Sequence, residues 1–142
     1  SYEKDDIEAK LVEVTQTDGD GAVYVPSEGK VFVNAKFTFV NDSTAALMIS
    51  FTSFSTTVDD AVLDQSLTGY YLMTKNGETS FDTAQNILAG KQLTGWVSYE
   101  VPSDWQKMDI SIVLNEWSQK KVRFVINRDQ VTVKQNSAGE TS

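Results

Sequence analysis

Three tryptophans are the best candidates for ligand-binding residues in this sequence. Trp96 lies in an alternating segment, opposite its apolar residues, whereas Trp105 and Trp117 lie in or beside turns. An exposed indole ring can stack on a sugar or anchor a protein partner. We therefore expect Trp96 on the exposed face of a strand and predict all three as ligand-binding residues. The competing interpretation is that each ring covers an edge or end of the core.

Two acidic clusters are candidate cation sites, and Ca²⁺ is the only cofactor for which the sequence offers ligands. Their members are Asp18 with Asp20, and Asp59 with Asp60 and Asp64. An EF-hand loop that starts at Asp18 needs Gly at its sixth position and Glu at its twelfth, where this sequence has Val23 and Gly29. Asp and Gly are also common turn residues, so solvated turns are the competing interpretation of both clusters.

Catalytic constellations are absent from the sequence, and we predict that the protein is not an enzyme. It contains no histidine and no cysteine, which removes the most common general base and the thiolate nucleophile. Residues 27–30 and 118–121 match Ser-x-x-Lys, but the companion motifs of penicillin-recognising enzymes are missing. A hydrolase that uses two carboxylates is a further alternative, although the spacing of the acids singles out no pair.

The composition is that of one globular domain over residues 1–142, with 40% hydrophobic and 23% charged residues. The polar segments 1–6 and 135–142 are expected to be flexible tails. Twenty acidic and twelve basic residues give a net charge of -8. This charge disfavours binding to nucleic acid and to anionic membrane surfaces. No apolar run is long enough to form a transmembrane segment.

Two alternating segments, residues 30–41 and 88–102, determine the predicted fold class. Each places apolar side chains at every second position, as a strand with one buried face does. Similar alternation predicts further strands at residues 7–14, 22–25, 47–51, 110–114, 122–126 and 131–133. About eight or nine strands separated by turns indicate an all-β protein with an antiparallel, immunoglobulin-like β-sandwich.

The middle of the chain is harder to interpret. The apolar parity shifts near Phe54, which suggests a bulge or a crossing between sheets. Residues 57–65 have apolar spacing compatible with one short helical turn. Residues 70–74 are predicted to form a strand, and the following Asn76-Gly77 pair predicts a β-hairpin.

Short motifs in the two alternating segments carry a resemblance to a known family. The matching residues are Asn41, after the first strand, and Gly90, Gly95, Val101 and Pro102 around the later strand. This pattern resembles the immunoglobulin-like domains of unknown function in secreted proteins and lipoproteins of Gram-positive bacteria. Their fold is similar to that of the mycobacterial immunoprotective extracellular protein. The resemblance covers residues 30–114 and brings no catalytic residues with it.

The resemblance implies an extracellular or cell-surface location, with a lipid anchor in the full-length precursor. It also implies a non-enzymatic module whose partner is a protein or a component of the cell envelope. The alternative is a carbohydrate-binding module that uses the exposed tryptophans.

Overall fold

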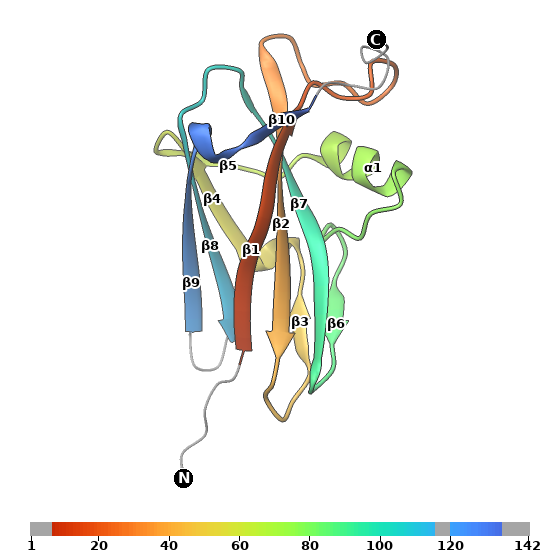
Figure 1. Ribbon diagram of the computed structural model, residues 1–142, viewed down its shortest axis with the longest axis vertical. Coiled ribbons are helices and arrows are strands. Elements are labelled where there is room, and N and C mark those ends of the chain that lie inside the picture. The colour runs from red at the N-terminus through yellow and green to blue at the C-terminus, as the bar shows by residue number, and fades with distance from the viewer. Residues whose placement is uncertain (1–6, 116–119, 135–142) are drawn as a thin grey trace.

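The computed structural model describes residues 7–115 and 120–134, which form a two-layered β-sandwich (Figure 1). Its strands are β1 (Ile7–Thr17), β2 (Lys30–Asn41), β3 (Leu47–Ile49), β4 (Phe54–Val58), β5 (Ala61–Leu63), β6 (Gln85–Ile87), β7 (Lys91–Pro102), β8 (Lys107–Asn115), β9 (Lys120–Asn127) and β10 (Thr132–Lys134). One α-helix, α1 (Leu67–Lys75), and two 3₁₀ turns, η1 (Phe51–Ser53) and η2 (Arg128–Gln130), complete the described elements. The predicted tails lie outside the described residues.

Two four-stranded sheets make up the layers, with strand orders β10-β1-β2-β7 and β5-β4-β8-β9. Strands β3 and β6 form a separate antiparallel pair beside the lower half of β7 in Figure 1. Every strand pair is antiparallel except β1 with β10. The predicted all-β, antiparallel sandwich is therefore confirmed, with ten strands in the described residues where eight or nine were expected.

The core lies between the two sheets and follows the alternation of the long strands. Strand β2 contributes Val33, Ala35, Phe37 and Phe39, all fully buried, and β8 contributes Met108, Ile110 and Ile112. Phe37 contacts Phe124 of the opposite sheet, with ring centroids 5.2 Å apart. Because side chains alternate between the two faces of a strand, the intervening residues of β2 point out of the sandwich.

The outward face of β2 and β7 is covered by α1, and this corrects two predictions. Residues 70–74, predicted as a strand, belong to the helix, which begins after Ser66, whose Oγ accepts a hydrogen bond from Gly69 N. Asn76-Gly77 ends the helix instead of forming a hairpin. Gly77 has a φ of 80°, and the N–H groups of Gly77 and Glu78 donate to the carbonyls of Thr74 and Met73. This is the glycine-terminated helix end that satisfies the last free carbonyls.

Residues 57–65 contain the turn and the second strand of the β-hairpin β4-β5, not the helical turn that their apolar spacing suggested. Asp59 and Asp60 are the two turn residues between β4 and β5, with φ values of 48° and 72°. Aspartate tolerates this left-handed conformation better than most residues, and two such residues in succession make the turn that matches strand twist. The crossing predicted near Phe54 is confirmed, because β3 pairs with β6 whereas β4 pairs with β8.

Residues 22–25, predicted as a short strand, form no strand, and residues 22–24 are bends. The side chain of Asp20 accepts hydrogen bonds from the backbone N–H groups of Ala22, Val23 and Tyr24. These bonds occupy the donors that a strand ladder would need, so the segment curls around the carboxylate.

Candidate binding groove

A groove of about 1050 Å³ opens on the sheet β5-β4-β8-β9. Its floor includes outward-facing side chains of three adjacent strands, namely Ser55, Thr57, Asp109, Ser111 and Arg123. Its walls come from η1, β5, the start of α1 and Asp82. The alternation that buries Phe54 and Val58 turns the intervening Ser55 and Thr57 toward the groove.

Three large apolar side chains of the walls are unusually exposed. Phe51 of η1 is 52% exposed, Val62 of β5 is 84% exposed and Leu67 of α1 is 65% exposed. Single exposed apolar residues are common on protein surfaces, but several that line one concavity are typical of a binding site. None of these three was singled out from the sequence. The only local signal was the break in apolar parity around Phe51 and Phe54.

An ion pair crosses the floor of the groove. Arg123 Nε lies 2.9 Å from Asp109 Oδ1 and Arg123 Nη2 lies 2.5 Å from Asp109 Oδ2, so the guanidinium binds both carboxylate oxygens. The hydrogen bonds from Arg123 hold the pKa of Asp109 below its ordinary value and raise the pKa of Arg123. This carboxylate therefore stays ionised and oriented, and it is a poor proton donor.

A chain of hydrogen bonds fixes the wall formed by η1 against α1. The buried Tyr70 hydroxyl donates to Gln65 Oε1, and Gln65 Nε2 donates to the carbonyl of Phe51 over 2.9 Å. Burial raises the pKa of Tyr70, so its phenol stays protonated. Phe51 is thus held in place by groups that are themselves packed, and the groove is preformed.

The predicted exposure of Trp96 is wrong. Its side chain is 8% exposed, and its Nε1 donates to Glu78 Oε1 over 3.1 Å. The chain that follows α1 runs along β7, where Trp96 N donates to the carbonyl of Thr79 and Phe81 N donates to the carbonyl of Trp96. This segment thus pairs with the edge of β7, and Lys36 Nζ of β2 lies 5.5 Å from the Trp96 ring centroid, so the ring has neighbours from outside its own strand.

Trp105 is also buried, with 0% exposure. Its Nε1 donates to Gln16 Oε1 over 2.9 Å, and the Arg128 guanidinium lies 5.9 Å from the ring centroid. Trp117 lies outside the described residues. Neither Trp96 nor Trp105 offers the open ring face that stacking on a sugar requires.

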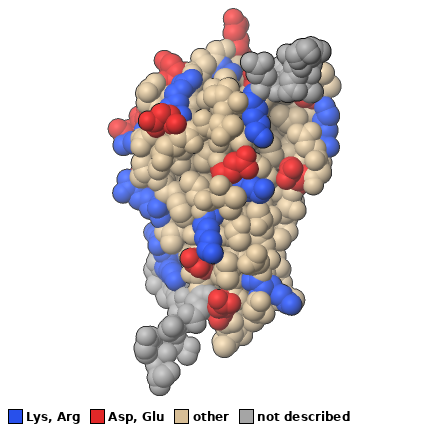
Figure 2. Space-filling model, in the orientation of Figure 1, with Lys and Arg blue, Asp and Glu red and all other residues tan. Residues whose placement is uncertain are grey.

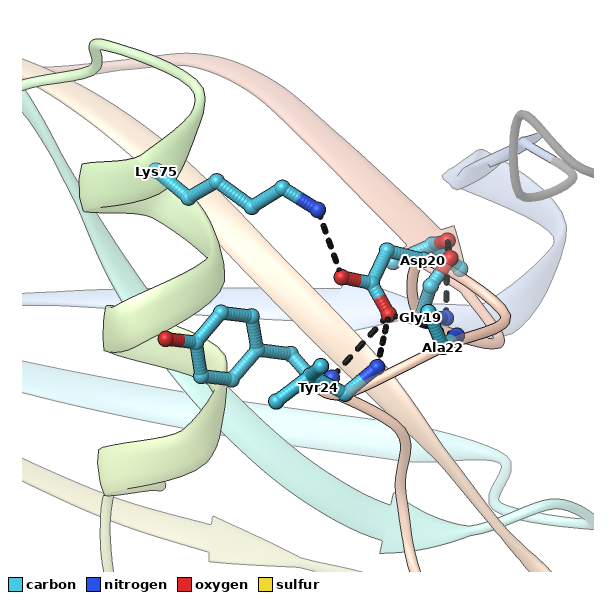
Figure 3. A network of polar contacts seen from close by, with 7 residues as sticks. Gly19, Asp20, Ala22, Tyr24 and Lys75 are labelled. Carbon is cyan, nitrogen blue, oxygen red and sulfur yellow. Dashed lines mark hydrogen bonds and ion pairs between the residues drawn. The ribbon is translucent and has the colours of Figure 1, made fainter.

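Asp20 of the first acidic cluster binds protein groups through both carboxylate oxygens (Figure 3). Lys75 reaches from the end of α1 and places its Nζ 2.7 Å from Asp20 Oδ2. The Lys75 hydrogen bond, helped by the backbone donors, lowers the pKa of Asp20 to about 2. The Tyr24 ring lies on the same side, 6.2 Å from the Tyr71 ring of α1. Asp20 thus joins the loop to the helix.

The second cluster is divided between two roles. The Asp59 carboxylate accepts hydrogen bonds from the backbone N–H groups of Gln106 and Lys107, at 3.2 Å and 2.9 Å, which ties the hairpin turn to the start of β8. Asp60 completes the turn, whereas Asp64 lines the groove. Within residues 7–115 and 120–134, no three acidic side chains converge in a way that could hold a metal ion.

Acidic and basic side chains are mixed over much of the face shown in Figure 2, and Lys and Arg gather along its left edge. None of the helices in the described part of the chain is long and apolar enough to span a bilayer.

The residues that carry the family resemblance have structural roles. Asn41 is fully buried, and its Nδ2 donates to the carbonyls of Ala45 and Ile87 at 2.8 Å each. Gly90 has a φ of 82° and donates its N–H to the Asn41 carbonyl over 2.7 Å. A Cβ at Gly95 would lie 2.9 Å from the Phe81 ring. Asn41 and Gly90 thus join the turn after β2 to the turn before β7, whereas Gly95 leaves room for the Phe81 ring.

Solved structures with the same fold come from Gram-positive bacteria. A candidate lipoprotein of Bacillus subtilis, YcdA, superposes with a TM-score of 0.69 at 15% identity, covering 90% of this chain. The chain spans only 38% of that protein. The YjhA protein of Bacillus subtilis gives a TM-score of 0.62 at 13% identity, with 94% of this chain and 95% of the other covered. A candidate lipoprotein of Staphylococcus aureus gives 0.56 at 18% identity, with 94% and 91% covered.

Sequence comparison assigns the family. No curated protein matches the chain. The profile of a domain of unknown function, DUF4352, matches residues 1–122, which is most of the chain. The solved structures that resemble this chain include candidate lipoproteins, as the sequence motifs implied. The chain therefore belongs to the DUF4352 family of domains of unknown function.

Proposed function

We propose that this chain is a non-enzymatic, extracellular or cell-surface module that binds a protein partner in the groove on the sheet β5-β4-β8-β9. The observation that carries the proposal is the convergence of Phe51, Val62 and Leu67, all exposed, on one preformed concavity. Several exposed apolar side chains that line one concavity, together with a few polar groups, are typical of binding sites. Family membership and the candidate lipoproteins among the structural relatives support the location.

Two titratable groups of the groove, Asp109 on its floor and Tyr70 on its wall, favour binding over catalysis. Asp109 is held ionised by Arg123, and the raised pKa of Tyr70 keeps its hydroxyl protonated. A general acid or base needs a pKa near the working pH, and these two groups are shifted away from it. Their hydrogen bonds position the groove instead.

A protein partner accounts for the groove better than a carbohydrate does. Sugar recognition commonly uses an open aromatic face, but Trp96 and Trp105 are covered by other parts of the chain. Of the three exposed apolar wall residues only Phe51 has a ring, whereas Val62 and Leu67 are aliphatic and match apolar side chains of a protein segment.

The test is affinity selection of a displayed random-peptide library on the purified chain. The selected peptides are then measured against Val62→Arg and Leu67→Arg, with Val133→Arg as the matched control. Val133 is 65% exposed on β10, outside the groove. We expect each groove variant to weaken binding at least about tenfold, or roughly 1.4 kcal/mol, while the control binds as wild type. Selected peptides that bind both groove variants unchanged would overturn the proposal, as would ligands found only on a glycan array.

A further inference from the structure

Resting on the proposed function, we infer that the occupant of the groove is an extended protein segment with basic side chains, which pairs with the free edge of β5. The inference names the partner class and the way it binds. Three independent features carry it, namely the unpaired edge of β5, the charge of the groove lining and the placement of the exposed apolar side chains.

Strand β5 is the outermost strand of its sheet in the described part of the chain, and β4 is its one strand neighbour there. In a hairpin with a two-residue turn, the residues next to the turn exchange hydrogen bonds, and here they are Val58 and Ala61. The next pair, Thr57 with Val62, is a non-hydrogen-bonded pair. The backbone N–H and C=O of Val62 therefore point away from β4, where an added strand can bind them.

The groove lining is predominantly acidic. It contains Asp64, Asp82 and Asp109 against the single base Arg123, and Arg123 is paired with Asp109. Asp64 and Asp82 therefore give the lining of the groove its net negative charge. The whole chain has a net charge of -8, which reinforces attraction of a basic segment and repulsion of an acidic one.

The exposed apolar side chains line the same groove as β5. Val62 belongs to β5 itself, whereas Phe51 and Leu67 come from the neighbouring η1 and α1 walls. Successive side chains of an added strand point to opposite faces, so alternate positions of one segment can contact apolar and acidic groups of the groove. A segment that alternates basic and apolar residues has the required pattern.

A second copy of this chain is a poorer occupant of the same edge. Pairing two β5 strands would bring together two copies of Asp59, Asp60 and Asp64, which flank a strand of only three residues. Like charges at a short edge oppose such association. Self-association is therefore an outcome that the test must detect.

The test is an NMR titration of the isotope-labelled chain with three synthetic peptides of equal length. The first alternates lysine with valine or phenylalanine, the second replaces each lysine by glutamate, and the third is the first with alternate backbone nitrogens methylated. We expect the basic peptide to shift the amide signals of Phe51, Val62 and Leu67. The acidic and methylated peptides should bind at least about tenfold more weakly. Added salt should weaken the binding of the basic peptide, because it screens the attraction between charges.

Charge variants give the matched comparison. Asp64→Asn should weaken binding of the basic peptide several-fold. Asp42 is exposed in the turn after β2 and lies outside the groove, so Asp42→Asn should leave this binding unchanged. Equal binding of the acidic peptide overturns the charge of the inferred partner, and equal binding of the methylated peptide overturns the strand pairing. A dimer that dissociates when Val62 is changed to Arg overturns the inference in favour of a second copy.

The outcomes separate this inference from the proposed function. If library-selected peptides depend on the groove but carry acidic or helical sequences, the inference is overturned and the proposed function stands. If no selected peptide depends on Val62 or Leu67, the proposed function is overturned, and the inference with it.

Discussion

The hydroxyl groups of Tyr99 on β7 and Thr56 on β4 share a buried hydrogen bond of 2.6 Å that joins the two sheets of the sandwich. Tyr99 is fully buried and Thr56 is 6% exposed, so neither hydroxyl has ready access to water as a replacement partner. Burial raises the pKa of Tyr99, which keeps the phenol neutral and able to donate. The bond also lies beside the groove, since Thr56 is part of its lining.

Replacing Tyr99 by Phe is expected to lower the free energy of unfolding by about 1–3 kcal/mol, because Thr56 keeps a buried hydroxyl without its partner. The double variant Tyr99→Phe/Thr56→Val removes both polar groups and should recover much of the loss. Urea denaturation measures both. The matched control is Tyr71→Phe, at a 52% exposed ring, where a change within about 0.5 kcal/mol is expected. A single variant as stable as wild type would show that the bond contributes nothing.

Asp20 should make stability depend on acid pH. Its pKa falls from 3.8 to about 2 in the folded chain. The ionised form therefore stabilises the fold fully above pH 3.8, and this contribution is lost as the pH falls through about 2. Asp20→Asn should flatten the decline of stability between these values, measured by urea denaturation at a series of pH values. Asp42→Asn is the control, and an Asp20→Asn profile parallel to that of wild type would contradict the prediction.

Gly69 is expected to tolerate no side chain. A Cβ there would overlap Ser98 Oγ and lie 2.9 Å from Ser98 Cβ, because α1 packs closely on the outward face of β7. Gly69→Ala should lower stability by about 1–3 kcal/mol, although alanine favours helices. Thr68→Ala, one position earlier in α1, should have no such cost. If Gly69→Ala raised the melting temperature, close packing of the helix on this face would be wrong.

Tryptophan fluorescence can test the burial of Trp96 and Trp105. In the variant Trp117→Phe, only these two indoles remain, and both are at most 8% exposed. We expect a blue-shifted emission that iodide quenches weakly, with a shift to the red on unfolding in urea. Strong iodide quenching of the folded variant would show that one of the two rings is exposed. It would then support the carbohydrate-binding alternative.

The sequence by itself was sufficient for the fold class, because the long strands β2 and β7 carry their signal locally. An apolar residue at every second position of β2, from Val31 to Phe39, specifies which face enters the core whatever surrounds it. The crossing near Phe54 and the short last strand were predictable for the same reason. The motif residues Asn41 and Gly90 were also visible, although their contact across the turns was not.

Asn76-Gly77 shows what local chemistry leaves open. The pair supplies a residue with positive φ, which suits both a hairpin turn and the end of a helix. The outward face of β2 and β7 decides between them, because Phe32, Asn34 and Ser98 lie there and need a cover. Packing of α1 on that face makes residues 67–75 helical.

The candidate site could hardly be predicted from the sequence, because contacts between distant segments form it. Trp96 was expected to be exposed because alternation describes only its own strand, but its side chain contacts Glu78 and Lys36 from other segments and is 8% exposed. The groove combines side chains from residue 51 to residue 123, on strands, turns and a helix. Their positions depend on strand order, on the turn at Asp59 and Asp60, and on the docking of α1. Such contacts between distant segments leave no periodic trace in a sequence, whereas the burial of a strand face does.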